Sequence, residues 1–509
     1  MLFSPKKILL AAFAMAASAP VITAQSDTTE VGDKETIVCY ISWFSPVGRF
    51  NGTRAWGQQG YRYAGDIASD GVRNYPLPPD IDWPDTPPPI GSDAFYELQF
   101  DAALATQEQM LDGGFDVMIF DMLPMPEYDP ALPLDEFNSP LAHFKTFLTW
   151  LEAAEDSGIK VGVMPDVANQ SGDYPQRRTP TVEEWTRILT ATLEVLPDSP
   201  ALWKIDDKPV LINFGTDSYY GGSAPAPEAA RPDRGWREIV QALRDTREPF
   251  YFIADIRPHA SVWEWNGIAD AAYMFAPASP DGGLVDAQQL FMRHLTIPYI
   301  WTVSPGYYRG GTAYTQPDFS RIHDAYMAAM REGAQRICVL TWNDFEENTD
   351  IAPSANKGRC LLDVFGFYNR WFKSGHQPEL PEDQVILAYP VRIPDTIVSK
   401  SPSFGRLDND MTPSGGTWNA PTYQPKVFYW AYVKEPTRLS VEGVGEVFFH
   451  KPGVWMGDLG CIAAGPVEVS LGERTMSLPD VVRTSMERAR RDEGGLDFRY
   501  VNLSTFEEQ

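Results

Sequence analysis

The sequence predicts an α/β protein: a closed parallel (β/α)8 barrel (a TIM barrel) followed by a smaller antiparallel β-sandwich domain. Two observations lead to this prediction. Eight short apolar, β-rich runs alternate with longer amphipathic segments up to about residue 380, and beyond that point strand-like runs follow one another without helices between them. Strands that alternate with helices are typical of parallel sheets. The alternative, a doubly wound open sheet, is disfavoured because no Gly-rich phosphate loop follows the first run.

The barrel strands are expected at residues 36–42, 116–123, 160–167, 209–216, 249–256, 270–276, 298–305 and 336–344. Segments between them carry apolar residues at three- and four-residue spacing, which indicates helices. The clearest are 95–114, 141–158, 181–196, 318–333 and, after the last strand, 361–375. Several of these helices end in a glycine after a charged turn, as helix C-termini commonly do.

The domain boundaries follow from these patterns. We expect the barrel at 34–380, the β-sandwich domain at 381–485 and a charged tail or surface helix at 486–509. The sandwich strands are predicted at 384–391, 426–433, 437–443, 446–451 and 466–472. Such a domain either binds carbohydrate or packs against the barrel, and we favour the structural role.

The N-terminal residues 1–24 read as a signal peptide. Lys6 and Lys7 form a basic start, an apolar stretch begins at Ile8, and small residues end at Ala24. The apolar stretch is too short for a permanent membrane span, and no other run is long enough to cross a bilayer. We therefore expect a secreted or periplasmic protein after cleavage near Ala24.

The net charge restricts the partners. A formal charge of −27 argues against nucleic acid and against an anionic membrane as partners. A hydrophobic fraction of 43% and an aromatic fraction of 13% describe a globular chain. A neutral ligand such as a polysaccharide is compatible with this charge.

Of the four cysteines, Cys39 and Cys338 lie inside predicted strands, so buried free thiols are the default expectation, although a bridge between Cys338 and Cys360 is an alternative in an oxidising compartment. Neither a CxxC nor an HExxH pattern occurs, and the six histidines are scattered. We therefore predict no metal site and no cofactor.

The active site of such a barrel forms where the strands end and the βα loops begin. At these ends the sequence places acidic, amide and aromatic residues: Trp43, Asp121, Asp166, Asp255, Tyr273, Tyr307, Tyr308, Trp342, Asn343, Asp344 and Glu347. Any one of the acids has an alternative role as a helix cap or salt bridge, and any one of the aromatics as barrel packing. Together they favour a sugar-binding cleft, because carboxylates accept hydrogen bonds from hydroxyls and aromatic faces stack on sugar rings.

Asp344 and Glu347 are the predicted catalytic pair. Glycosidic hydrolysis needs two carboxyl groups, one to donate a proton and one to activate water or attack carbon. These two lie three positions apart on the turn leaving the last strand, so both can face the cleft. Glu346 should point elsewhere, and Asp350 should make a local contact. The alternative is a solvated acidic turn.

The stretch "TWNDFEENTDIAPS" resembles the Trp-Asn-Asp-Tyr-x-Glu-Ser-x-x-Ile-Gly-Pro signature of glycoside hydrolase family 71, the α-1,3-glucanases called mutanases. The matching positions are Trp342, Asn343, Asp344, Glu347, Ile351 and Pro353, while Phe345 and Asn348 depart from the signature. The resemblance implies an inverting mechanism with Asp344 and Glu347 as the pair. The segment 436–460 also resembles the β-domain that closes mutanase-type proteins.

The same stretch is similar to the Trp-Asn-Glu-Trp-x-Glu-x-Thr-x-Ile-x-Pro stretch of family 99, the endo-α-mannosidases and mannanases. Thr349 matches that stretch, and "SPGYYRG" at 304–310 resembles a Pro-Gly-Tyr segment of the family. Asp344 at the first acid favours family 71.

The sequence therefore predicts a hydrolase of an α-linked polysaccharide, with α-1,3-glucan first and α-mannan as the alternative. We assign the general acid to Glu347 and the water-activating base to Asp344, but the two roles can be exchanged. A non-catalytic polysaccharide-binding protein is a further alternative. A polysaccharide lyase is disfavoured, because no Tyr/His or Lys base stands out.

Overall fold

The computed structural model describes residues 34–42, 45–47, 77–122, 140–165, 186, 189–190, 192–194, 196–214, 236–246, 249–256, 262–275, 283–306, 308–309, 312–313, 318–345, 348–394, 425–479, 482–485 and 498–506.

Eight parallel strands form the barrel at the positions that the sequence predicts. They are β1 (Glu35–Ile41), β2 (Val117–Met122), β3 (Lys160–Pro165), β5 (Lys208–Asn213), β6 (Tyr251–Asp255), β7 (Ala271–Tyr273), β8 (Trp301–Val303) and β11 (Arg336–Val339). Parallel pairing gives the order β7-β6-β5-β3-β2-β1-β11-β8. The strands are almost entirely buried, as expected when both faces of a parallel sheet are covered.

The two ends of this sheet meet. Ala272 of β7 forms a parallel bridge with Tyr299, just before β8. The Ala272 N–H donates to the Pro298 carbonyl at 3.0 Å, and the Ile300 N–H donates to the Ala272 carbonyl at 2.8 Å. The predicted eight-stranded barrel is thus confirmed. Because its strands are parallel, their C-terminal ends share one mouth.

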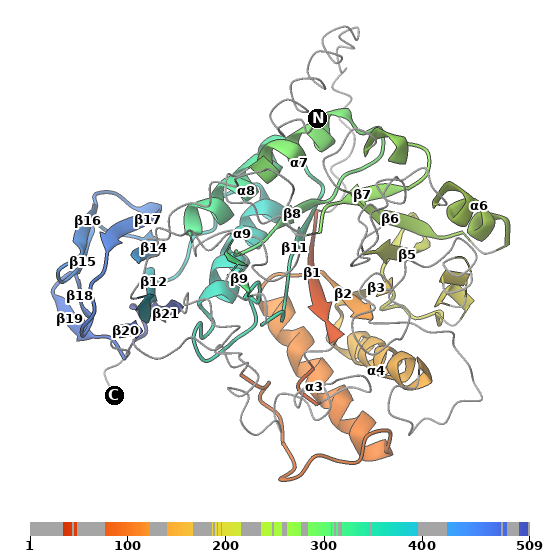
Figure 1. The fold of residues 1–509 in the computed structure, drawn as a ribbon, viewed down its shortest axis with the longest axis horizontal. Helices are drawn as coiled ribbons and strands as arrows, with labels where there is room; N and C mark the ends of the chain where they lie inside the picture. Colours follow the sequence, from red (N-terminus) through yellow and green to blue (C-terminus); the bar gives the residue numbers. More distant parts are fainter. Residues whose placement is uncertain are drawn as a thin grey trace, which may run out of the picture.

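Helices surround the barrel (Figure 1). They are α3 (Asp93–Asp112), α4 (Pro140–Ser157), α6 (Trp236–Thr246), α7 (Gly283–His294), α8 (Phe319–Arg331) and α9 (Cys360–Ser374). Ser92 caps α3 by accepting the Phe95 N–H at 3.2 Å, and α9 ends at Gly375, which adopts the left-handed conformation that glycine tolerates. The shorter elements are β4 (Lys204–Ile205), η3 (Val262–Trp265), β9 (Tyr308–Arg309) and β10 (Thr312–Ala313).

The C-terminal region forms two antiparallel four-stranded sheets, as predicted for a sandwich. One has the order β17-β14-β12-β21 and the other β16-β15-β18-β19. Their strands are β12 (Gln384–Pro390), β14 (Lys426–Val433), β15 (Thr437–Val441), β16 (Gly445–Phe449), β17 (Gly453–Cys461), β18 (Glu468–Leu471), β19 (Arg474–Ser477) and β21 (Phe498–Asn502). A parallel pair, β13 (Arg392–Pro394) and β20 (Arg483–Ser485), lies beside them.

Strand β14 shows how this domain is attached. Its alternate residues Val427, Tyr429, Ala431 and Val433 belong to the core between the two sheets. The residues between these, Phe428, Trp430 and Tyr432, belong to the same core as the barrel helices. Figure 1 shows the blue C-terminal strands beside α8 and α9. One face of the first sheet is therefore buried against the barrel.

Strand β21 lies inside the segment expected to be a charged tail. It pairs antiparallel with β12 over Phe498–Asn502 and forms the edge of the first sheet. Phe498 and Tyr500 are buried in the core shared with the barrel, which explains why this short run is ordered. All four cysteines are free, so no bridge joins Cys338 to Cys360; Cys461 is the exposed one.

Candidate active site

The loop after β11 carries the predicted catalytic motif, and its two arms are hydrogen-bonded to each other. The Thr341 N–H donates to the Thr349 carbonyl at 3.0 Å, and the hydroxyls of the same two residues lie 2.9 Å apart. The Trp342 carbonyl accepts from the N–H groups of Ile351 (3.0 Å) and Ala352 (2.9 Å). The two described arms of the loop are thus held together by hydrogen bonds at the mouth of the barrel.

Asp344 is hydrogen-bonded to one of these arms through Thr341. Its backbone N–H donates to the Thr341 hydroxyl at 3.0 Å, and the residue is only 8% exposed. Withdrawing a carboxylate from water costs free energy unless polar groups compensate for it. A nearly buried acid on a fixed loop is compatible with the predicted catalytic role. Its predicted partner, Glu347, lies outside the described residues.

Asn343 joins the loop to the end of β1. Its Oδ1 accepts the Ile41 N–H at 2.7 Å, and its Nδ2 donates to the Ile41 carbonyl at 3.0 Å. The Trp342 N–H donates to the Cys39 carbonyl at 2.7 Å. The sequence predicts Asn343 as a substrate ligand. In the structure, its side-chain amide is hydrogen-bonded to the backbone of Ile41.

Asp350 forms a buried ion pair with Lys357. The Lys357 Nζ donates to Asp350 Oδ1 at 2.7 Å, to the Asp350 carbonyl at 2.9 Å and to the Asn348 carbonyl at 3.4 Å. Desolvation lowers the pKa of Lys357 from its ordinary value, and the charge of Asp350 opposes this shift. The expected local contact of Asp350 is thus a buried charge pair inside the loop.

Three of the predicted residues, Asp121, Asp255 and Tyr273, lie at strand ends of the barrel and are buried. Burial raises the pKa of Tyr273 well above its ordinary value, and the nearby carboxylates of Asp255 and Asp121 raise it further. Asp255 Oδ1 accepts the Phe275 N–H at 2.7 Å. The Tyr273 hydroxyl donates to the Asn213 carbonyl at 3.4 Å. The structure therefore brings these two acids and the phenol into one neighbourhood.

The other four predicted sugar ligands have no described side chain. Trp43, Asp166 and Tyr307 lie outside the described residues, and Tyr308 is placed in β9 by its backbone. Their roles as sugar ligands stay predictions.

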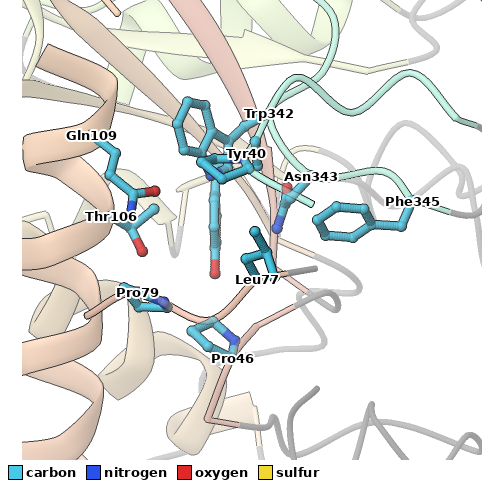
Figure 2. Close-up of a pocket in the computed structure, with 11 residues that line it drawn as sticks. Tyr40, Pro46, Leu77, Pro79, Thr106, Gln109, Trp342, Asn343 and Phe345 are labelled. Carbon is cyan, nitrogen blue, oxygen red and sulfur yellow. The ribbon is translucent and has the colours of Figure 1, made fainter. Parts of the chain in front are cut away.

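A small pocket adjoins the motif on the outer side of β1 (Figure 2). Tyr40 and Trp342 lie across it from Thr106 and Gln109 of α3, and Leu77 lies along its edge. Its volume of about 10 Å³ has room for about one water molecule. Trp342 is only 2% exposed, which favours the packing alternative for this ring.

Among the described residues, no group of three or more His, Cys, Asp or Glu is arranged to hold a metal ion. None of the helices described combines the length and the apolar character needed to cross a membrane.

The chain matches no protein-family model and no curated protein. Among solved structures it is similar to the family 99 endo-α-mannosidase from Bacteroides thetaiotaomicron, at 15% identity and a TM-score of 0.46, over 68% of this chain and 99% of that chain. A glycoside hydrolase-like protein is similar at 13% identity and a TM-score of 0.43, over 72% and 99% of the two chains. The modular family 26 endo-β-1,4-mannanase from Cellulomonas fimi is similar at 13% identity and a TM-score of 0.36, over 73% and 87%. The barrel itself follows from the strand order of this chain, independently of these neighbours.

Sequence reasoning missed the residues that hold the loop. Lys357 sits seven residues beyond Asp350, and two of its three acceptors are backbone carbonyls, which no side-chain motif reveals. Thr341 and Thr349 flank the acids in the sequence, but the contact between them depends on how the loop turns back.

Proposed function

We propose that this protein is a secreted glycoside hydrolase that cleaves an α-linked polysaccharide, with α-1,3-glucan as the first candidate. Asp344 and Glu347 are the proposed catalytic pair. The observation that carries the proposal is the placement of Asp344, nearly buried on a hydrogen-bonded loop at the C-terminal mouth of the barrel. This is where barrels of this kind assemble their active sites.

The proposed chemistry uses one carboxylic acid and one carboxylate. Glu347 protonates the oxygen of the leaving sugar while Asp344 accepts a proton from water, which attacks the anomeric carbon from the opposite face. The reverse assignment uses the same two groups. An inverting reaction changes the anomeric configuration, so α-linked substrate gives β-configured product.

A hydrolase of α-mannan is the second candidate, and the resemblance of the motif to family 99 favours it. Thr349 matches the family 99 stretch. The resemblance of residues 304–310 to the same family adds to this. Both candidates require the same catalytic pair and differ in the sugar bound.

The substrate is tested by incubating the protein with α-1,3-glucan, other α-glucans and α-mannans. Mass spectrometry gives the sizes of the products, and proton NMR during the first minutes gives their anomeric configuration. Release of glucose oligomers in the β-configuration supports the first candidate, and release of mannose oligomers supports the second. Binding without product from any polymer would favour the non-catalytic alternative.

The catalytic pair is tested by Asp344→Asn and Glu347→Gln. Each amide removes the proton transfer while keeping the side-chain shape, so we expect kcat to fall by at least about 10²-fold to 10³-fold with the melting temperature retained. Asp245→Asn on α6 is the matched control. This exposed acid accepts a hydrogen bond from Gln241 at 2.7 Å and lies about a hundred residues before the motif. Residual turnover near the wild-type rate in either variant would remove that residue from the mechanism.

A further inference from the structure

A turn at residues 354–358 connects the acid-bearing loop to α9, and it touches the C-terminal domain. Within the turn, the Gly358 N–H donates to the Ser354 carbonyl at 2.7 Å. From outside, the Tyr500 N–H of β21 donates to the Asn356 carbonyl at 2.8 Å, and the guanidinium of Arg499 donates to the Ala355 carbonyl. The outer edge of β21 therefore pairs with this turn.

Lys357, in the same turn, reaches back into the loop. Its ammonium has three N–H donors, and it has three acceptors there: the Asp350 carboxylate and the carbonyls of Asp350 and Asn348. The side chains of both Lys357 and Asp350 are buried, at 7% and 0% exposure. Burial raises the pKa of the Tyr500 phenol, and the charge of Asp350 raises it further.

The contacts continue from this pair to the acid. Thr349, between the two carbonyls that Lys357 binds, is paired with Thr341 through both backbone and hydroxyl. The Thr341 hydroxyl in turn accepts the N–H of Asp344 at 3.0 Å. Hydrogen bonds and the peptide links between neighbouring residues thus connect β21 through Lys357 to Asp344.

We infer that Lys357 is a positioning residue for the proposed hydrolysis, and that the C-terminal domain, through β21, holds the acid-bearing loop in its reactive geometry. This inference rests on the proposed function. A buried ion pair gains little stability over an uncharged pair of similar volume. It does, however, fix the direction of two loop carbonyls, and a displacement of about 1 Å at a reacting group can cost about 10²-fold in rate.

The decisive variant is the double substitution Lys357→Met with Asp350→Asn, which removes the pair without leaving an uncompensated buried charge. We expect kcat on the hydrolysed polymer to fall by at least about tenfold while KM changes less than about threefold and the melting temperature is largely kept. Hydrogen–deuterium exchange of peptides within 341–352 should be faster than in the wild type. The matched control is Lys426→Met with Asp458→Asn, a Lys–Asp pair 3.0 Å apart on the C-terminal sheet, and it should leave both readouts unchanged.

Arg499→Ala provides a second test that leaves the buried pair intact, and it should change kcat and loop exchange in the same direction by a smaller factor. Unchanged exchange in both variants overturns the inference, whatever the activity. If the wild-type protein is active and both variants keep its kcat, the inference is also overturned. If the wild-type protein hydrolyses none of the polymers, the proposed function is overturned. Faster exchange of 341–352 in the variants would still show that β21 and Lys357 hold the loop.

Discussion

At the scale of single residues, Asn343 shows how a motif side chain fixes backbone. Its amide satisfies both the N–H and the carbonyl of Ile41 at the end of β1. A side-chain amide offers a donor and an acceptor side by side, whereas an ionised carboxylate offers acceptors alone. The residue next to the proposed catalytic Asp344 therefore joins the first and last strands of the barrel at the mouth.

Asn343→Asp tests this role. The carboxylate still accepts from the Ile41 N–H, but its second oxygen then faces the Ile41 carbonyl, so a buried donor is lost and two acceptors oppose each other. We expect the free energy of unfolding, measured in urea, to fall by about 1–3 kcal/mol. Gln335→Ala, an exposed amide with one hydrogen bond to Gly333, should cost less than about 0.5 kcal/mol. Equal losses in the two variants would contradict the proposed link.

The sequence predicts the position of Asp344 because a buried strand has a definite end, and parallel strands end at one mouth. The same reasoning places Asp121, Asp255 and Tyr273 there. The same reasoning does not predict the contacts of Lys357 with Asp350 and Asn348, because these depend on the path of a turn and on the directions of two backbone carbonyls. Nor does it show that Trp342 packs beside Tyr40 outside the barrel, because the side to which a loop residue points has no periodicity.

At the scale of elements, α8 and α9 contact the C-terminal domain through a hydrogen-bonded group of His323, Tyr368 and Trp430, which lies inside an aromatic cluster. The Tyr368 hydroxyl accepts from the Trp430 indole N–H at 3.3 Å and lies 3.1 Å from His323 Nδ1. His323 Nδ1 can accept the hydroxyl proton only when the ring is neutral and carries its own proton on Nε2. A protonated ring carries a proton on both nitrogens, so Nδ1 can then only donate.

This contact predicts a pH dependence. Desolvation lowers the pKa of His323 below its ordinary 6.5, against the opposing charge of Asp324, so the unfolded chain binds the proton more readily than the folded chain. The stabilisation is present above the unfolded pKa and is lost as the pH falls from 6.5 toward the lowered folded value. Urea unfolding between about pH 7.5 and about pH 5.5 should therefore show a weaker pH slope for His323→Gln than for the wild type. His376→Gln, at an exposed position, should keep the wild-type slope.

At the scale of the whole molecule, the barrel and the sandwich share one core. Trp430 is fully buried and packs edge-on against Phe367 of α9, with ring centroids 5.3 Å apart. The strands that the sequence indicates in this domain include long apolar runs, such as β12 and β14, and shorter alternating runs, such as β15 and β18. It misses β17, which is interrupted by glycines, and β21, which is short and follows a charged stretch. Both owe their order to tertiary pairing more than to their own pattern.

Because the core is shared, calorimetry should show a single cooperative unfolding transition for the wild type. Trp430→Ala should lower the free energy of unfolding by about 3–5 kcal/mol and separate the transition into two. Phe448→Ala is the matched control, since this aromatic residue of the same domain is 52% exposed, and it should cost less than about 0.5 kcal/mol. Two transitions in the wild type would show that the two domains unfold independently.

The pairing of β21 with the turn at 354–358 has a consequence during translation. Arg499 is made 144 residues after the Ala355 carbonyl that it binds. At about 5–20 residues per second, a ribosome needs on the order of ten seconds to cover that interval. During that time the emerging barrel lacks the contact of β21 with the turn at 354–358. A nonsense or frameshift mutation anywhere in the interval removes this contact permanently from the acid-bearing loop.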